Sequence, residues 1–132
     1  MNEEDNKRNR EMVDSIYEEV VQCVNGELYR DENGECVGRP DEADDEWDDT
    51  HEQMSLYDYF DDIPDLKFTV TGTKSRAEVV GVSIMVTFGG PNIYVHEDRV
   101  RLHWWSDYAE SRRFPDNVEE AILEFASEMF NC

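Results

Sequence analysis

The segment "LKFTVTGTKSRAEVVGVSIMVTFGGPNIYVHEDRVRLHWW", residues 66–105, indicates most of the architecture, because apolar residues recur along it at every second position. This alternation is typical of β-strands that bury one face of a sheet. Short turns separate the strand-like runs, which are 66–71, 80–88, 93–96 and 99–105. Strands joined by short turns pair antiparallel, so we predict a meander of three to four strands with one buried face.

The alternation also predicts which side chains are buried in the meander. The expected buried face consists of Leu66, Phe68, Val70, Val80, Val82, Ile84, Val86, Phe88, Val100, Leu102 and Trp104. Trp105 falls on the opposite face, with Arg101 and His103. There it is either covered by another element or exposed as a contact residue, and the sequence leaves both interpretations open.

Amphipathic helices are predicted at both ends of the chain. Residues 3–25 carry apolar residues at helical spacing, and Asn25-Gly26 is a stop signal. The C-terminal segment "FPDNVEEAILEFASEMF", residues 114–130, begins with Asp116 and Glu119 in the spacing of a capping box. Its expected apolar stripe is Val118, Ile122, Phe125, Ala126, Met129 and Phe130.

Two shorter elements are predicted between the first helix and the meander. "ELYRDENGECVG", residues 27–38, indicates a hairpin with a type I′ turn at Asn33-Gly34. In "SLYDYFDDI", residues 55–63, Ser55 and Asp58 predict a capped short helix. Pro64 would end this helix, and its side chains would anchor the acidic region through Leu56, Tyr57, Tyr59, Phe60 and Ile63.

These elements together predict an α+β fold in which the N- and C-terminal helices pack on one face of the antiparallel meander. A chain of 132 residues has the size of one domain. We therefore expect a single domain over 1–132 with an acidic insertion at 41–65. Within the insertion, residues 41–54 fit either a helix that buries a thin stripe with Trp47 and Met54, or a solvated loop.

The net charge of −21, from 33 acidic and 12 basic residues, excludes several classes of function. Nucleic acid and anionic membranes would repel this surface, whereas basic proteins would be attracted to it. Three scattered cysteines fit a reducing, cytoplasmic environment, and no apolar run is long enough to span a membrane. Catalytic motifs and metal-ligand spacings are not found, so we expect a non-enzymatic protein without cofactor or metal.

The acidic residues are concentrated in one segment. Residues 41–65 contain twelve carboxylates and no Lys or Arg, about twice their even share of the chain. If 41–65 formed one helix, its charges would be spaced at roughly 3 Å, close to the phosphates of one DNA strand. We therefore predict a partner-binding surface made of Asp41, Glu42, Asp44, Asp45, Glu46, Trp47, Asp48, Asp49, Glu52, Asp58, Asp61 and Asp62.

Within this surface Trp47 is the predicted aromatic anchor, because it lies between charged neighbours where a role in the core is hard to arrange. Interfaces that bind specifically add a few aromatic contacts to a charged rim. We therefore expect loss of this ring to weaken partner binding and to leave the free protein stable. The alternative is a solvated acidic loop that keeps the protein soluble.

The segments "SLYDYFDDI" (55–63), "VSIMVTFGGPNIYV" (82–95) and "VRLHWWSDYAE" (100–110) resemble a group of small acidic accessory proteins carried by phages and mobile elements of Gram-positive bacteria. The resemblance covers residues about 55–110, less than half of the chain. Such genes often encode inhibitors of host defence, including anti-CRISPR and antirestriction proteins that mimic DNA. The resemblance implies an inhibitor of a defence nuclease in the cytoplasm of a bacterial host cell.

Charge and resemblance together lead us to expect a DNA mimic that binds a basic nucleic-acid-binding protein. The most specific expectation is an anti-CRISPR protein that covers the site for the PAM duplex on a Cas9-type effector nuclease. The alternatives are an inhibitor of a restriction enzyme, and an acidic adaptor or chaperone of a basic protein. A small metal-dependent enzyme would need a pocket of converging polar groups.

Overall fold

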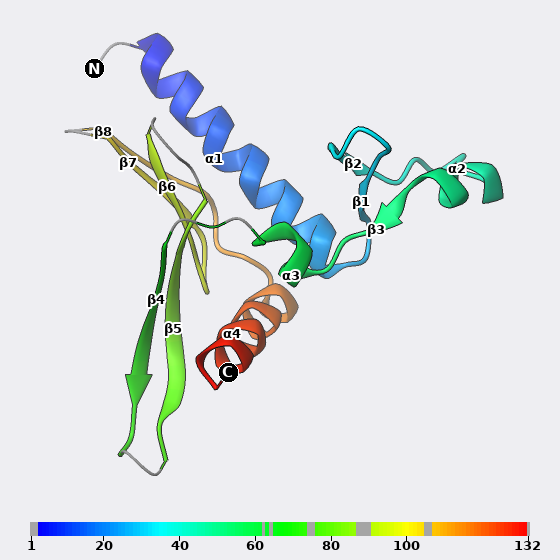
Figure 1. Cartoon of the computed structure of the whole chain (residues 1–132). Coiled ribbons are helices and arrows are strands. Elements are labelled where there is room, and N and C mark those ends of the chain that lie inside the picture. Colours follow the sequence, from blue (N-terminus) through cyan, green and yellow to red (C-terminus); the bar gives the residue numbers. More distant parts are fainter. Residues whose placement is uncertain are drawn as a thin grey trace.

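The computed structural model describes residues 3–61, 63, 65–73, 76–86, 91–104 and 107–131 (Figure 1). The helices are α1 (Glu3–Val24), α2 (Asp45–Thr50), α3 (Leu56–Tyr59) and α4 (Asp116–Phe130). The strands are β1 (Leu28–Arg30), β2 (Cys36–Gly38), β3 (Glu52–Gln53), β4 (Asp65–Thr71), β5 (Glu78–Met85), β6 (Asn92–His96), β7 (Val100–Trp104) and β8 (Asp107–Glu110). The predicted α+β fold, with helices at both ends, is confirmed.

The larger sheet is an antiparallel meander with the strand order β4-β5-β6-β7-β8. It contains the four predicted strands and one more, β8, whose pairing with β7 opposes Leu102 to Ala109. The predictions for Phe88 and Trp105, and for the side chain of Trp104, lie outside the part of the chain that the structure describes. The prediction that the helix after Ser55 continues to Pro64 is wrong, since α3 ends at Tyr59.

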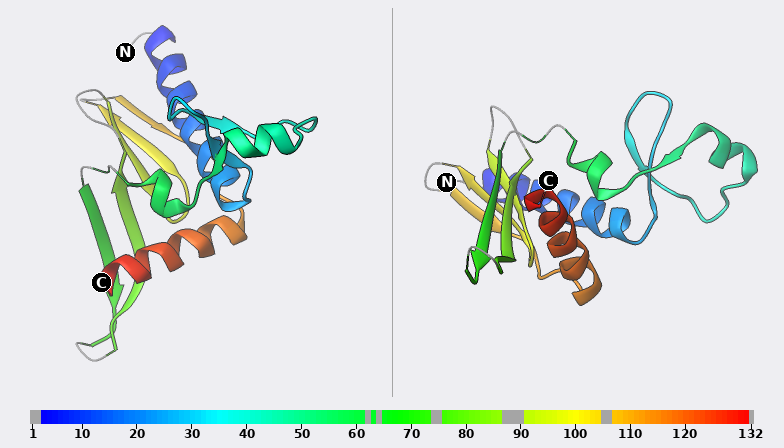
Figure 2. Two further views of the ribbon diagram at one scale, coloured as in Figure 1. Left: turned by 45° about the vertical axis from the view of Figure 1, so that its right-hand side comes forward. Right: turned by 60° about the horizontal axis from the view of Figure 1, so that its bottom comes forward.

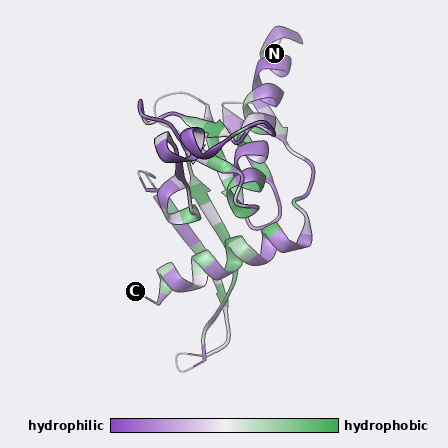
Figure 3. Cartoon of the chain, turned by 90° about the vertical axis from the view of Figure 1, so that its right-hand side faces the viewer, coloured by the Kyte–Doolittle hydropathy of each residue, from purple (hydrophilic) through white to green (hydrophobic). Residues whose placement is uncertain are grey.

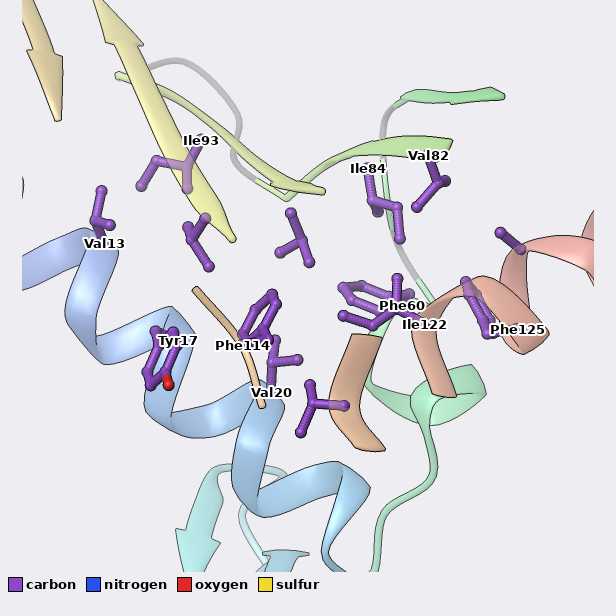
Figure 4. Packing of buried hydrophobic residues seen from close by; sticks show 14 of the residues in the cluster. Val13, Tyr17, Val20, Phe60, Val82, Ile84, Ile93, Phe114, Ile122 and Phe125 are labelled. Atoms are coloured by element: carbon purple, nitrogen blue, oxygen red, sulfur yellow. The ribbon is translucent and has the colours of Figure 1, made fainter. Parts of the chain in front are cut away.

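Both long helices cover the same face of this sheet, as predicted. The C-terminal helix α4 lies against β5, and α1 lies against β7 and β8 (Figure 2). Figure 3 shows hydrophobic positions on the strands and on the long helices. Because strand residues alternate, the inward-facing side chains of β5 to β8 pack together in an apolar core (Figure 4), whereas Leu66, Phe68 and Val86 are only partly buried. The centre of this core contains Val13, Tyr17, Val20, Ile84, Ile93, Val95, Val100, Leu102, Phe114, Val118, Ile122 and Phe125.

The prediction that Val80 is buried is wrong, because the pairing of β4 with β5 contains a register shift. Thr69 pairs with Gly81 and Val70 with Val79, so Val80 is the extra residue of a bulge. The shift buries Val79 and leaves Val80 44% exposed. The prediction that Val70 is buried is also wrong, since its side chain is 45% exposed. Val82 and Ile84 beyond the bulge face inward as predicted.

Two predictions about the helices are also wrong. Asp116 and Glu119 do not form a capping box, since α4 begins after Pro115 and has no side-chain cap. Tyr57 was expected in the core but is 46% exposed, because the short helix α3 presents it along the edge of Phe125 and toward Glu128. Its neighbour Phe60 is buried as predicted, and the capping box of Ser55 and Asp58 is present.

The predicted hairpin is present, but it belongs to a second, three-stranded sheet with the order β2-β1-β3. Its turn is not of the type expected at Asn33-Gly34. The amide of Gly34 donates to the carbonyl of Asp31, and the Asp31 side chain accepts from Asn33 and Glu35. Gly34 follows this turn with φ of +82°, the left-handed conformation that glycine adopts at no steric cost. We call β1, β2 and β3 the small sheet.

Two valines on β5 test the bulge. Val82→Ala should lower the free energy of unfolding by about 2 kcal/mol, because it removes two buried methyl groups and leaves a cavity. Val80→Ala should cost well under about 1 kcal/mol, because that side chain is largely in solvent. Urea titration of both variants measures the difference, and equal losses would contradict the register described here.

Candidate functional site

The acidic segment forms a projection that we call the acidic arm, residues 41–53. It leaves the small sheet after β2, contains α2, and returns as β3 beside β1. The arm and the small sheet lie beyond α1, on the side away from the large sheet (Figures 1 and 2). Seven of the nine residues from 41 to 49 are acidic, so this end of the molecule carries a dense negative charge.

The start of α2 uses part of this charge to form the helix. Asp44 is the N-cap, and its carboxylate accepts a hydrogen bond of 3.0 Å from the backbone amide of Trp47. Asp45, Glu46 and Asp48 occupy the first turn, where the positive end of the helix dipole favours acidic side chains. Helix formation therefore offsets some of the repulsion among the carboxylates.

Trp47 attaches α2 to the small sheet. Its ring stacks on the imidazole of His51 at 3.8 Å and meets the ring of Tyr29 edge-on at 5.0 Å. The backbone carbonyl of Trp47 also lies 2.8 Å from His51 Nδ1. The side chain is half-buried and belongs to neither of the two buried apolar clusters of the described residues. That the free protein stays stable without this ring stays a prediction. Its contribution to partner binding stays a prediction.

Arg39, immediately before the arm, binds one of the seven carboxylates. Its guanidinium donates through Nε and Nη2 to the two oxygens of Asp48, at 3.1 and 3.2 Å. The hydrogen bonds from Arg39 hold the pKa of the Asp48 carboxyl below its usual value. The sequence did not predict this contact. Arg39 and Asp48 are nine residues apart, and only the fold of β2 and α2 brings them together.

The base of the arm is fixed by a small apolar cluster of Cys23, Leu28 and Met54. The amide of Met54 donates to the carbonyl of Leu28, and Cys23 Sγ lies 3.6 Å from the carbonyl of Met54. Gln53 Nε2 donates to the carbonyl of Gly26, which has φ of +75° at the end of α1. The arm is thereby anchored to the last turn of α1.

Ionisable groups are half-buried where α1, β2 and α3 meet. Burial raises the pKa of Glu19, and hydrogen bonds with Cys36 and Tyr59 offset part of this rise. Burial likewise raises the pKa of the Cys23 thiol to about 12, so Cys23 is a neutral thiol at physiological pH. These groups are suited to packing under the small sheet rather than to nucleophilic chemistry.

The predicted binding residues do not form one continuous row, because 41–65 is not a single helix. Those of the arm are exposed together and comprise Asp41, Glu42, Asp44, Asp45, Glu46, Asp48, Asp49 and Glu52. Asp58 belongs to the capping box of α3, where hydrogen bonds from Ser55 lower its pKa. Asp61 is exposed after α3, and Asp62 lies outside the described residues.

No family model, curated protein or solved structure matches this chain. None of the helices described is long and apolar enough to cross a membrane. In the same part of the chain, no three His, Cys, Asp or Glu side chains are grouped as metal ligands. The functional argument therefore rests on the arm's own geometry and charge.

Removing the Trp47 ring should loosen the arm and leave the main core intact. In Trp47→Ala we expect the amides of β3 and of Met54 to exchange hydrogen about tenfold faster, which corresponds to about 1.4 kcal/mol. Amides of β5 should be unaffected, and Trp47→Phe should retain most of the protection. Unchanged exchange in Trp47→Ala would show that the ring contacts do not hold the arm.

Glu19→Gln should stabilise the protein near pH 7. A carboxyl with a raised folded pKa binds its proton more tightly when folded, so its ionisation costs stability as pH rises above 4.5. The melting temperature of Glu19→Gln should exceed that of the wild type near pH 7, and the difference should shrink toward pH 4. Glu11→Gln, on the exposed side of α1, is the control and should show neither effect.

Proposed function

We propose that the acidic arm is a DNA-mimicking surface that occupies the basic groove of a nucleic-acid-binding protein and excludes DNA from it. The observation that carries this proposal is the exposure of seven carboxylates within residues 41–49 on one projection. The nearest basic residue, Arg39, is already bound to Asp48. Most of the arm's charge is thus available to a cationic partner.

The density of charge suits a groove built for phosphates. The six residues of α2 span about 9 Å, over which a single DNA strand presents about three phosphates. The same short helix carries Asp45, Glu46, Asp48 and Asp49. A compact cluster of this kind attracts lysine and arginine side chains, and its binding releases counterions as the binding of DNA does. Its length matches only a few phosphates of one strand.

The most specific form of the proposal is inhibition of a Cas9-type effector at its site for the PAM duplex. In that site, arginines donate two parallel hydrogen bonds to guanine edges. Carboxylates accept the same pair of hydrogen bonds from a guanidinium, and do so more strongly because both partners are charged. The small size of the arm fits a site that reads only a short stretch of duplex.

Neutralising the arm should abolish binding without harming the fold. The variant combining Glu42→Gln, Asp45→Asn, Glu46→Gln and Asp49→Asn keeps the Asp44 cap and the Arg39–Asp48 pair. We expect at least about a tenfold loss of affinity for a Cas9-type effector, measured by fluorescence anisotropy, and an unchanged or higher melting temperature.

The matched control removes four charges from the exposed side of α1, through Glu3→Gln, Glu4→Gln, Glu11→Gln and Asp14→Asn. It should bind nearly as well as the wild type. If both variants lost the same affinity, the net charge of the chain alone, and not the position of the arm's carboxylates, would explain binding. Binding should also weaken with salt and compete with a duplex containing the PAM. Simultaneous binding of protein and duplex with unchanged affinities would overturn mimicry and favour an adaptor.

A further inference from the structure

The outer face of the large sheet, opposite to α1 and α4, carries a second distinctive surface. Residues of β6, β7 and β8 that alternate with the buried ones point away from the helices, which pack against the inner face (Figure 2). We call these residues, together with Asp98 and Arg99 of the turn between β6 and β7, the outer patch. It consists of Tyr94, His96, Asp98, Arg99, Arg101, His103, Tyr108 and Glu110.

The rings of the outer patch form a connected row across three strands. Tyr94 lies 6.3 Å from His96 and 6.0 Å from His103, and His103 lies 5.0 Å from Tyr108. Tyr108, on the edge strand β8, is 46% exposed. Tyrosine and arginine are the residue types that contribute most to binding energy at protein interfaces.

The charges of the outer patch balance one another. Arg99 lies 3.3 Å from Asp98 and 3.1 Å from Glu110. Arg101 lies 3.8 Å and 3.6 Å from the same two carboxylates. The hydrogen bond from Tyr108 and the nearby arginines lower the pKa of Glu110, which is therefore ionised at neutral pH. Two arginines and two carboxylates give a formal charge of zero, in a chain with a net charge of −21.

We propose that the outer patch is the interface of a homodimer whose two copies are related by a twofold axis. A twofold interface joins the same surface on both subunits, so it must be complementary to itself. The outer patch meets this condition because it presents arginines and carboxylates in equal number beside a row of aromatic and imidazole rings. A surface of the chain with an excess of acidic residues would be repelled by its own copy.

The geometry also limits the repulsion between the two subunits. The acidic arm lies beyond α1 on the opposite side of the molecule, so pairing through the outer patch directs the two arms away from each other (Figure 1). Charges separated by more than about 10 Å are largely screened at physiological salt. Pairing through the outer patch therefore keeps the two arms apart in a chain with a net charge of −21.

The size of the patch predicts a weak dimer. Three strands at about 4.8 Å spacing, each about 15 Å long, give a footprint smaller than the ~800 Å² per partner of a standard interface. We expect association in the micromolar range, which is visible only as a dependence of mass on concentration. This inference does not depend on the proposed function of the arm.

Sedimentation equilibrium between about 5 and about 200 µM tests the proposal. The apparent mass of the wild type should rise from 15.5 kDa toward twice that value. Arg101→Glu should weaken association at least about tenfold, because it opposes carboxylates across the axis. Lys67→Glu makes the same change in net charge on β4, where the side chain is 76% exposed, and should leave association unchanged.

Tyr108→Ala provides a second test that leaves the ion pairs and the net charge in place, and it should weaken association to a similar extent. Thermal melting shows whether each variant is folded. If Arg101→Glu is unfolded, the association of Tyr108→Ala, which changes an exposed side chain, decides the test. A wild type that remains at 15.5 kDa throughout overturns the proposal. So does a dimer that tolerates both patch variants, or one that Lys67→Glu disrupts equally.

Discussion

Burial of the inner face of the large sheet beneath α1 and α4 is the interaction on which the rest of the structure depends. Helix α1 serves two surfaces, because Val13, Tyr17 and Val20 face the large sheet, whereas Cys23 near its end contacts Leu28 and Met54 of the small cluster. The acidic arm is therefore held by the last turn of a helix whose position is set by the main core. Changes in the arm need not reach the sheet, since the two apolar clusters share only partly buried side chains.

Like-charge repulsion is the second constraint, and the chain meets it differently in different places. Asp44 and Asp58 cap helices, and Asp48 is held by Arg39. On the outer patch, Asp98 and Glu110 are balanced by two arginines. Each arrangement gives a carboxylate a specific donor or cation. The remaining carboxylates of the arm stand close together in solvent, where their repulsion lowers stability and the dipole of α2 offsets only part of it. Because the fold does not account for these carboxylates of the arm, we look for their role in the binding of a partner.

Apolar periodicity was sufficient to predict the two terminal helices, four strands and most of the buried face of the meander, because burial of one face imposes a period on the sequence. It left residues 41–54 open between a helix and a loop. It failed at Val80, since a bulge inserts one residue without leaving a mark in the residue types. It also missed β3, β8 and the role of Trp47. The two residues of β3 are too few to show a period, and β8 is polar except where Ala109 faces inward. The contact of Trp47 with Tyr29 depends on how the arm returns beside β1, which no local pattern encodes, whereas His51 lies only four residues after Trp47, at the end of α2.

The division of the acidic segment into α2, β3 and α3 changes the form of the DNA mimicry that we propose. A continuous helix would copy a row of phosphates along one strand, and it would suit a long groove. The observed arm instead gathers its charge at one tip, which suits a site that contacts DNA over a few base pairs. A dimer formed through the outer patch would carry two such tips at opposite ends. The two arms could bind one partner together only if its two sites were separated by the length of the whole dimer. A single effector would therefore bind one arm, and the second arm would remain available for another molecule.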